Sequence, residues 1–244
     1  MNSVRSLVFT SILFLTCVPC GLVIIAVRVF GTKASYRVAM FWCRSILWWC
    51  RVLCGLDFTV EGQENIPARN CVVFLKHSSA YEAIAQWLIF PNQCWVLKRE
   101  LIWAPFFGWA LACLQPISID RGAGRTAVEQ VVRQGKLRLA EGCWVMIYPE
   151  GTRMAAGKTR RYGVSGTLLA EASGGVILPV AHNAGDFWPR RGWRKKAGLV
   201  RFVIGPTIDP AGREAREVNE EIQSWIERTV AEIRAAAARH PSPG

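Results

Sequence analysis

The sequence predicts an α/β protein with a central, mostly parallel or mixed sheet flanked by helices and an N-terminal two-helix membrane motif. Two observations lead to this prediction. Beyond Asp57, short apolar runs alternate with helix-compatible stretches, which is the pattern of strands joined by helices. Before that residue the chain is almost continuously apolar and rich in tryptophan. We therefore expect membrane-associated helices over residues 1–57 and an α/β domain over residues 58–244.

The first apolar segment is long enough to cross a bilayer. Residues 6–27 contain no charged side chain and would form a helix about 30 Å long. A cleaved signal peptide is the alternative, but no small-x-small cleavage site follows and the next segment is again apolar. If this helix crosses the membrane, Arg28, Lys33 and Arg37 place its C-terminal side in the cytoplasm.

Residues 36–56 carry a basic stripe among aromatic side chains. Arg37, Arg44 and Arg51 recur every seven residues, so on a helix they drift by only about 20° per repeat. The aromatic residues between them are Phe41, Trp42, Trp48 and Trp49. The pattern is typical of a helix at the lipid interface; the alternative is a buried helix of a soluble protein whose arginines reach water. We predict attachment to a membrane without choosing between a spanning and a surface-bound helix.

The composition restricts the partners of the chain. Hydrophobic residues make up 51% of the sequence, 11 residues are tryptophan, and basic residues exceed acidic ones by 30 − 18 = 12. Such a surface attracts anionic lipid headgroups, acidic carrier proteins or nucleic acid. Because no nucleic-acid-binding module accompanies the basic residues, nucleic acid is not an expected partner. The nine cysteines indicate small hydrophobic side chains in a reducing compartment, and we expect no metal site.

Seven apolar runs in the α/β part are predicted strands. They cover residues 58–60, 71–75, 94–97, 117–119, 143–148, 176–181 and 200–204. The predicted helices cover residues 80–90, 125–141, 164–173 and 213–239. Open α/β sheets bind their ligands at the carboxyl ends of strands. Polar residues that directly follow the predicted strands are therefore the candidates for a functional site.

A histidine follows the predicted strand at residues 71–75, where the chain turns into a helix. At physiological pH a neutral imidazole accepts a proton, provided that a neighbour fixes its tautomer. If Glu82 accepts a hydrogen bond from Nδ1 of His77, Nε2 is left free as a general base. Alternatively, Ser79 and Glu82 form a helix capping box, in which Glu82 binds a backbone amide and His77 is an ordinary loop residue.

The segment 148–153, Tyr-Pro-Glu-Gly-Thr-Arg, follows another apolar run. Gly151 permits close approach of a ligand to the backbone. Arg153 is suited to bind a phosphate through two parallel hydrogen bonds, and Glu150 is suited to accept one from a polyol hydroxyl. The alternative is a polar loop closed by an ion pair between Glu150 and Arg153.

Two further strand ends carry polar residues. Arg121 ends the run 116–121 and either binds a phosphate or forms a strand-end ion pair. His182 follows the run 178–181, where a structural role is the expected one. Pro179 within that run indicates an edge strand or a strand end, which is also a place for a pocket wall.

Taken in order, these segments resemble the four motifs of the glycerolipid acyltransferase family, over most of residues 60–185. The first motif, His-x4-Asp, corresponds to His77 and Glu82, with Glu in place of Asp. The arginine of the second corresponds to Arg121. The third, Phe-Pro-Glu-Gly-Thr-Arg, corresponds to residues 148–153 with Tyr for Phe. The fourth, a proline between two apolar residues, corresponds to residues 178–180.

The resemblance implies transfer of an acyl group from acyl-CoA or acyl carrier protein to the free sn-2 hydroxyl of lysophosphatidic acid, which gives phosphatidic acid. It assigns His77 as the base and Glu82 as the residue that orients it. The residues implied in binding the phosphate and glycerol are Arg121, Glu150, Gly151, Thr152 and Arg153, and those of the pocket wall are Pro179 and Val180. No metal or prosthetic group is implied, because a thioester is already activated. Direct transfer is expected, since no Gly-x-Ser-x-Gly nucleophile elbow is present.

Two alternatives stay open from the sequence. The first is the same acyl transfer to another lysolipid, such as a lyso-ornithine lipid, a lysophospholipid or a lipid A precursor. The second is a protein of a different class, which uses its positive charge to bind anionic membrane partners without catalysis. In each case we expect anionic lipids as partners and a place at the cytoplasmic, inner membrane with the α/β domain facing the cytoplasm.

Overall fold

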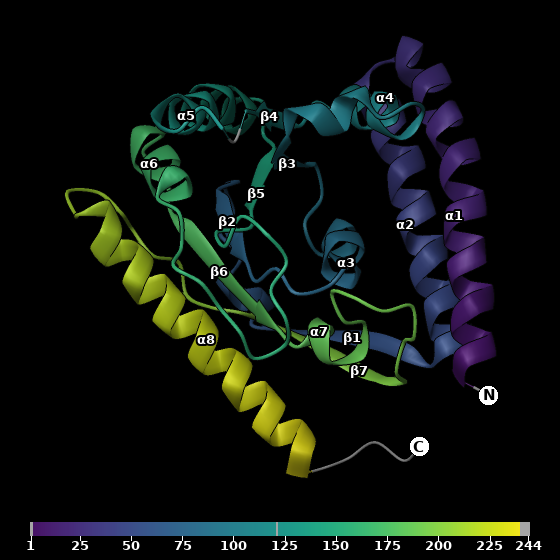
Figure 1. Ribbon diagram of the computed structural model, residues 1–244. Coiled ribbons are helices and arrows are strands. Elements are labelled where there is room, and N and C mark those ends of the chain that lie inside the picture. The colour runs from purple at the N-terminus through teal and green to yellow at the C-terminus, as the bar shows by residue number, and fades with distance from the viewer. Residues whose placement is uncertain (1, 121, 240–244) are drawn as a thin grey trace.

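The structure is a computed structural model that describes residues 2–120 and 122–239. Its centre is a seven-stranded sheet with the order β1-β7-β6-β2-β5-β3-β4 (Figure 1). The strands are β1 (Leu56–Glu61), β2 (Val72–Leu75), β3 (Gln93–Lys98), β4 (Ile117–Ile119), β5 (Trp144–Ile147), β6 (Ile177–His182) and β7 (Gly198–Ile204). All neighbours are parallel except β6 and β7. The mixed, mostly parallel sheet confirms the predicted fold class, and each predicted run forms a strand.

Helices cover both faces of the sheet. The α-helices are α1 (Asn2–Ala26), α2 (Thr32–Cys54), α3 (Tyr81–Ile89), α4 (Phe107–Cys113), α5 (Arg125–Ala140), α6 (Ser165–Ala172), α7 (Ala184–Phe187) and α8 (Ala215–Arg239). Short 3-10 helices cover Val27–Phe30, Gln63–Asn65 and Arg99–Trp103. Helices α5, α6 and α8 lie on one face, and α3 with the pair α1 and α2 lies on the other (Figure 1). The sequence did not predict α4 and α7, because seven and four residues are too few to show a helical period.

The central strands are buried on both faces. In β2, Val72 and Phe74 belong to the core under α5, α6 and α8, whereas Val73 and Leu75 belong to the core under α3. This alternation follows from the two-residue period of a strand, and burial on both sides explains why the run is apolar throughout. The first polar residues after β2 therefore lie at its carboxyl end, where the chain leaves the core.

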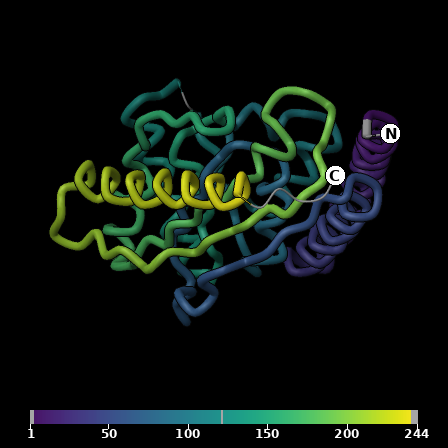
Figure 2. The backbone as a smooth tube through the Cα atoms, turned by 90° about the horizontal axis from the view of Figure 1, so that it is seen from below, coloured from purple at the N-terminus to yellow at the C-terminus, as the bar shows by residue number. Residues whose placement is uncertain are grey.

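Helices α1 and α2 lie side by side at one edge of the molecule, away from α8 (Figures 1 and 2). The 28-residue stretch Ser3–Phe30 is apolar and long enough to cross a membrane, and only 11% of its apolar window is buried. Phe14 and Leu15, for example, are 67% and 75% exposed. Exposed apolar side chains along a whole helix point to association with a membrane.

Helix α2 has one buried and one exposed face. Ile46 and Leu47 are buried against neighbouring helices. The predicted arginine stripe is on the opposite face, where Arg37, Arg44 and Arg51 are exposed. Phe41 and Trp48 between them are also exposed, at 73% and 54%. The combination of cations and aromatic rings on one face is the one that suits lipid headgroups.

The structure corrects the prediction that Pro179 marks an edge or a strand end. Pro179 lies within β6, which runs between β7 and β2. A proline is tolerated there because β7 ends at Ile204 and its ladder with β6 begins only at Val180. The carbonyl of Pro179 accepts a hydrogen bond from the N–H of Gly205 at 2.9 Å. The N–H and C=O groups of one residue point to the same side of a strand. The N–H that Pro179 lacks would therefore point to the place where β7 has already ended, so no hydrogen bond of the ladder is lost.

Candidate active site

The candidate site lies at the carboxyl ends of three adjacent strands. In the sheet, β6, β2 and β5 are neighbours and run parallel. His77 follows β2, Glu150 follows β5, and His182 ends β6. Because parallel strands end at the same edge, motifs that are distant along the chain meet here.

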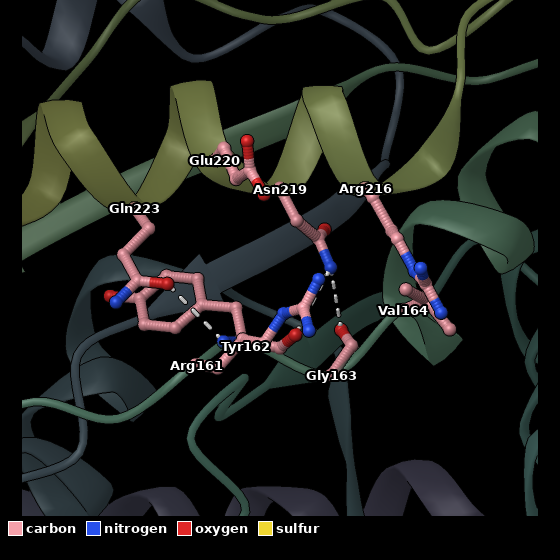
Figure 3. A pocket seen from close by; sticks show the side chains of 8 residues that line it. All are labelled: Arg161, Tyr162, Gly163, Val164, Arg216, Asn219, Glu220 and Gln223. Carbon is pink, nitrogen blue, oxygen red and sulfur yellow. Dashed lines mark hydrogen bonds between the residues drawn. The ribbon is translucent and has the colours of Figure 1, made fainter.

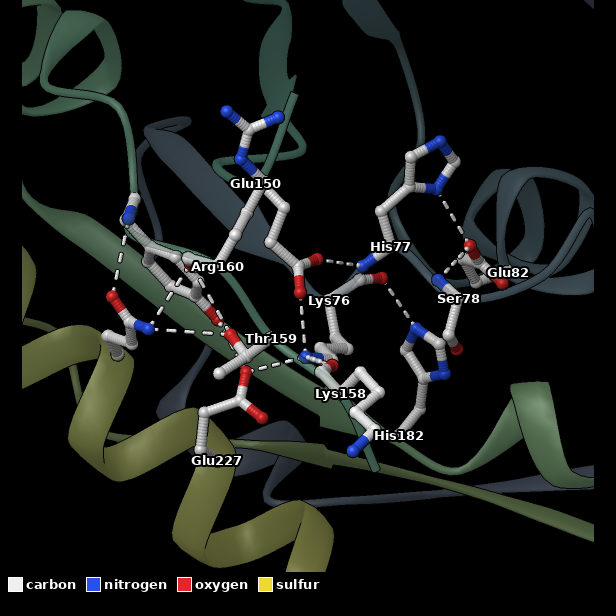
Figure 4. Close-up of polar contacts among 12 residues, drawn as sticks. Lys76, His77, Ser78, Glu82, Glu150, Lys158, Thr159, Arg160, His182 and Glu227 are labelled. Carbon is white, nitrogen blue, oxygen red and sulfur yellow. Dashed lines mark hydrogen bonds and ion pairs between the residues drawn. The ribbon is translucent and has the colours of Figure 1, made fainter. Parts of the chain in front are cut away.

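The contact between His77 and Glu82 is present (Figure 4), and the helix cap accompanies it. Nδ1 of His77 lies 2.9 Å from Oε1 of Glu82. The same oxygen accepts the backbone N–H groups of Ser78 and Ser79, each at 3.0 Å. Oγ of Ser79 in turn accepts the N–H of Tyr81 at 3.0 Å, at the start of α3. Glu82 therefore contacts the imidazole and caps the helix at once, so the two readings of the sequence do not compete.

The carboxylate of Glu82 is completely buried. Burial by itself raises the pKa of a carboxyl group, but the hydrogen bonds from His77 and from the amide of Ser79 lower it, and the pKa of Glu82 lies below its ordinary value. Glu82 is thus ionised at neutral pH. A carboxylate only accepts hydrogen bonds, so Nδ1 of His77 carries a proton, and in a neutral imidazole Nε2 is then the nitrogen with the lone pair.

The surrounding backbone fixes His77 as well. Its N–H donates to Oε2 of Glu150 at 2.9 Å, and its carbonyl accepts the N–H of Met154 at 2.7 Å. The side chain remains 18% exposed. With three polar atoms of His77 bound, Nε2 is the one for which the described residues provide no partner, and it is left to meet a ligand.

Tyr148 stacks on the imidazole of His77. The ring centroids are 4.0 Å apart and the planes differ by 24°. The hydroxyl of Tyr148 donates to Oε1 of Gln86 at 3.0 Å, which fixes the ring. Burial raises the pKa of Tyr148, so the phenol stays neutral. An aromatic face in contact with the ring stabilises an imidazolium.

Glu150 has both oxygens occupied inside the protein. Oε1 binds Nζ of Lys76 at 2.6 Å, and Oε2 accepts the N–H of His77. Its side chain is fully buried. The carboxylate therefore pairs with Lys76 instead of forming the Glu150–Arg153 ion pair that the sequence left open. This arrangement favours support of the His77 loop over the predicted contact with a glycerol hydroxyl.

Residues 151–153 lie at the surface beside His77. Gly151 is exposed and has a φ of +67°, a value that favours glycine, and a Cβ there would have no neighbour within 4 Å. Thr152 is half-buried and Arg153 is exposed. The next residue, Met154, is bonded to the carbonyl of His77, and the charge of Arg153 lowers the pKa of Tyr148. Arg153 therefore lies in the loop that is bonded to the backbone of His77.

Two of the other predicted site residues, Pro179 and Val180, are not at this surface. Arg121 lies outside the described residues. Pro179 and Val180 are both buried in β6, and the carbonyl of Val180 accepts the N–H of Lys76 at 3.2 Å. Their role as a pocket wall stays a prediction. Among residues 2–120 and 122–239, no three metal-ligating side chains gather at one place.

Comparison with known proteins decides the family. A family model described as acyltransferase matches residues 57–183, which is more than half of the chain. The chain belongs to the acyltransferase family. The protein is therefore an enzyme, and the alternative of a membrane-binding protein without catalysis is set aside.

Similar proteins and a similar structure agree with this assignment. This acyltransferase is 43% identical over 217 residues to a 1-acyl-sn-glycerol-3-phosphate acyltransferase of Pseudomonas aeruginosa, which covers 86% of this chain and 84% of the relative. A protein of the same description from Borreliella burgdorferi is 30% identical over 160 residues, 64% of each chain. The crystal structure of a 1-acyl-sn-glycerophosphate acyltransferase from Thermotoga maritima superposes with a TM-score of 0.78 at 24% identity, covering 96% of both chains, and shows the same fold.

Three residues of the acyltransferase site had no role in the sequence-based prediction. Lys76 directly precedes His77, but an isolated lysine gives no signal of burial. Tyr148 was noted only as a replacement for phenylalanine. Glu227 of α8, whose Oε1 lies 2.6 Å from Nζ of Lys76, is far from every motif. Only the packing of α8 against the sheet brings it to the site.

A separate cavity of about 240 Å³ lies between residues 161–164 and α8 (Figure 3). Its lining residues are Arg161, Tyr162, Gly163, Val164, Arg216, Asn219, Glu220 and Gln223. None of the predicted site residues belongs to this lining. We therefore place the acyltransferase site at the strand ends and not in this cavity.

His182 has the structural role that the sequence favours. Its Nε2 donates to the carbonyl of Lys76 at 2.7 Å, and its Nδ1 accepts the N–H of Ala184 at 3.1 Å. The second bond requires an unprotonated Nδ1, so the ring is neutral. Burial lowers the pKa of His182 below 6.5. His182 therefore holds the backbone of Lys76, before the His77 loop, and takes no part in proton transfer.

This burial predicts a pH dependence of stability. Because the folded pKa of His182 is below the unfolded value of 6.5, its contribution is complete above that pH and is lost as the pH falls from there towards the folded pKa. In that window the free energy of unfolding is expected to fall by about 1.4 kcal/mol per pH unit. His182→Gln, which keeps a donor for the Lys76 carbonyl, should lack this slope in thermal unfolding of the purified protein. An identical slope in both proteins would assign the effect to other groups.

Proposed function

We propose that this acyltransferase transfers an acyl group from an acyl thioester to the free sn-2 hydroxyl of 1-acyl-glycerol-3-phosphate, giving phosphatidic acid. The observation that carries the proposal is the 2.9 Å contact of Nδ1 of His77 with buried Glu82, which leaves Nε2 as a base at the surface. The names of the relatives from Pseudomonas aeruginosa and Borreliella burgdorferi support the choice of acceptor.

His77 acts as a general base in the transfer. Nε2 takes the proton of the glycerol hydroxyl while the hydroxyl oxygen attacks the thioester carbonyl carbon. Glu82 and the face of Tyr148 stabilise the imidazolium that forms. Collapse of the tetrahedral intermediate breaks the carbon–sulfur bond, and the imidazolium returns its proton to the leaving thiolate. The base is thus regenerated without an acyl-enzyme.

The substrate phosphate binds to arginine. Arg153 is exposed next to the His77 loop, and a guanidinium pairs with phosphate through two hydrogen bonds. Arg121, which follows the residues of β4 in the sequence and lies outside the described residues, is the second candidate. Gly151 and Thr152, in the same loop as Arg153, border the glycerol.

The acyl donor is acyl-CoA or an acyl carrier protein, and transfer takes place at the cytoplasmic side of the inner membrane. The net charge of +12 favours both an acidic carrier and anionic lipids. In this proposal residues 1–57 hold the enzyme to the membrane and residues 58–244 carry the chemistry. The exposed apolar surface of α1 supports the division.

The acceptor is tested with purified enzyme, both thioester donors and a panel of lysolipids. Arg153→Ala is expected to raise KM for lysophosphatidic acid by about 10- to 100-fold, because each charge-assisted hydrogen bond contributes about 1.5–3 kcal/mol. The value of kcat should change little, since the phosphate is bound equally in the ground and transition states. Acceptors without a phosphate should be poor substrates for the wild type and insensitive to the substitution.

Arg190→Ala is the matched control, because Arg190 is also exposed but lies in another loop. It should leave KM for lysophosphatidic acid at the wild-type value. A wild-type preference for a lyso-ornithine lipid or another acceptor without a phosphate monoester would overturn the choice of acceptor, while acyl transfer itself would stand.

A further inference from the structure

A buried lysine lies directly before the base. Lys76 is 2% exposed, and its Nζ has three acceptors (Figure 4). Oε1 of Glu150 and Oε1 of Glu227 are each 2.6 Å away, and the carbonyl of Lys158 is at 2.9 Å. An ammonium group has three N–H donors, so the site satisfies it completely.

The three charged residues form a continuous chain from α8 to the base. Glu227 on α8 binds Lys76, Lys76 binds one oxygen of Glu150, and the other oxygen of Glu150 accepts the N–H of His77. The hydroxyl of Tyr162 donates to Glu227 at 3.2 Å, which fixes that carboxylate in turn. The backbone of Lys76 is also bound at both ends, by Val180 and His182. The described polar contacts of Lys76 hold both its side chain and its backbone. They therefore restrict the movement of Lys76, which directly precedes His77.

Folding stability alone does not explain why charged side chains are buried beside His77. Burial raises the pKa of Glu150, while the ammonium of Lys76 lowers it. Taking ions out of water is costly, and apolar side chains of similar volume often serve folding equally well. Buried ion pairs, however, hold their side chains at defined distances and angles, which apolar packing does not. A defined geometry is useful where the side chain of a general base has to be oriented toward its substrate.

We propose that Lys76 and Glu227 are positioning residues of the reaction, which aim His77 from the C-terminal helix through Glu150. The inference rests on the proposed role of His77 as the base. Glu227 lies outside residues 57–183, the part that matches the family model. Helix α8 is therefore part of the catalytic apparatus, although it supplies no group that touches the substrate.

Glu227→Gln tests the proposal in the full-length enzyme. Gln keeps an acceptor for Lys76 and Tyr162 but removes the charge that holds the ammonium. We expect kcat to fall by about 10- to 100-fold, because small misplacement of a catalytic group has effects of this size. KM for lysophosphatidic acid and for the thioester should stay within about threefold, since no substrate contact is lost. Glu227→Asp retains the charge with a shorter reach and should restore part of kcat.

Glu232→Gln is the matched control. It removes the same charge from the same helix, at a side chain that is 68% exposed and 4.0 Å from Arg228. Its kcat and thermal midpoint should equal those of the wild type. A folded Glu227→Gln protein with wild-type kcat and only a lower thermal midpoint would overturn the proposal. If Glu227→Gln does not fold, the folded Glu227→Asp enzyme decides: reduced kcat with unchanged KM supports positioning, and wild-type kcat contradicts it.

The proposed function fails separately from this inference. If His77→Ala retains activity, the assignment of the base is wrong, and if the wild type does not acylate lysophosphatidic acid, the proposed acceptor is wrong. If His77→Ala is inactive while Glu227→Gln has the wild-type kcat, the base assignment stands and only the positioning role of α8 is wrong.

Discussion

Replacement of His77 by alanine is expected to lower kcat by about 1,000-fold, within the range of general-base catalysis. The substitution removes Nε2, which is the polar atom of His77 left for substrate once Glu82, Glu150 and Met154 have bound the others. Consumption of the acyl thioester by purified enzyme in the presence of lysophosphatidic acid measures the effect.

The control for this variant is its binding to membranes. His77 is not part of the exposed helices α1 and α2, so His77→Ala should sediment with vesicles containing anionic lipid as the wild type does. Near-normal turnover in His77→Ala would exclude His77 as the base. A covalent acyl-protein that forms and decays at the catalytic rate would instead contradict direct transfer.

Glu82→Gln is expected to reduce kcat by about 100-fold, because the imidazolium loses the adjacent negative charge that stabilises it. The amide oxygen of Gln is able to replace Oε1, which accepts from His77, Ser78 and Ser79. The amide nitrogen then occupies the place of Oε2, for which the described residues provide no hydrogen-bond partner. The substitution thus removes the charge with little change of geometry, and steady-state kinetics at neutral pH measure the result.

Ser79→Ala separates the two functions of Glu82. It deletes the Oγ that caps α3 through Tyr81 but leaves the charge of Glu82 and the amide of Ser79 in place. We expect a loss of about 1 kcal/mol in stability with little change in kcat. If Glu82→Gln resembles Ser79→Ala, with lower stability and normal turnover, then Glu82 is a helix cap only.

The local part of the site was predictable because its residues are close along the chain. His77 and Glu82 flank a single turn from β2 into α3, so a strand end and a helix start place them together. The capping box has the same local origin, and the structure shows that one carboxylate oxygen serves both purposes. The apolar runs of β2, β5 and β6 were predictable for a similar reason, since these strands are buried on both faces and, apart from His182 at the end of β6, are apolar throughout.

The roles of Glu150 and Pro179 were harder to predict, because they depend on partners elsewhere in the chain. Motif chemistry placed Glu150 at a glycerol hydroxyl, but Lys76 from the neighbouring strand end occupies it. Pro179 indicated an edge, yet it is tolerated inside the sheet because β7 stops at Ile204. In both cases the neighbouring strand decides what a polar or a proline residue does.

The sequence by itself determined the family, the α/β class, the apolar N-terminal helix and the candidate base with its carboxylate, because these depend on composition, periodicity and short spacings. Only the tertiary structure decided the strand order, the stacking of Tyr148 on His77 and the link from Glu227 through Lys76 to the base. Those contacts join residues that are far apart along the chain. Their geometry arises when the sheet and α8 pack together, and no local pattern records it.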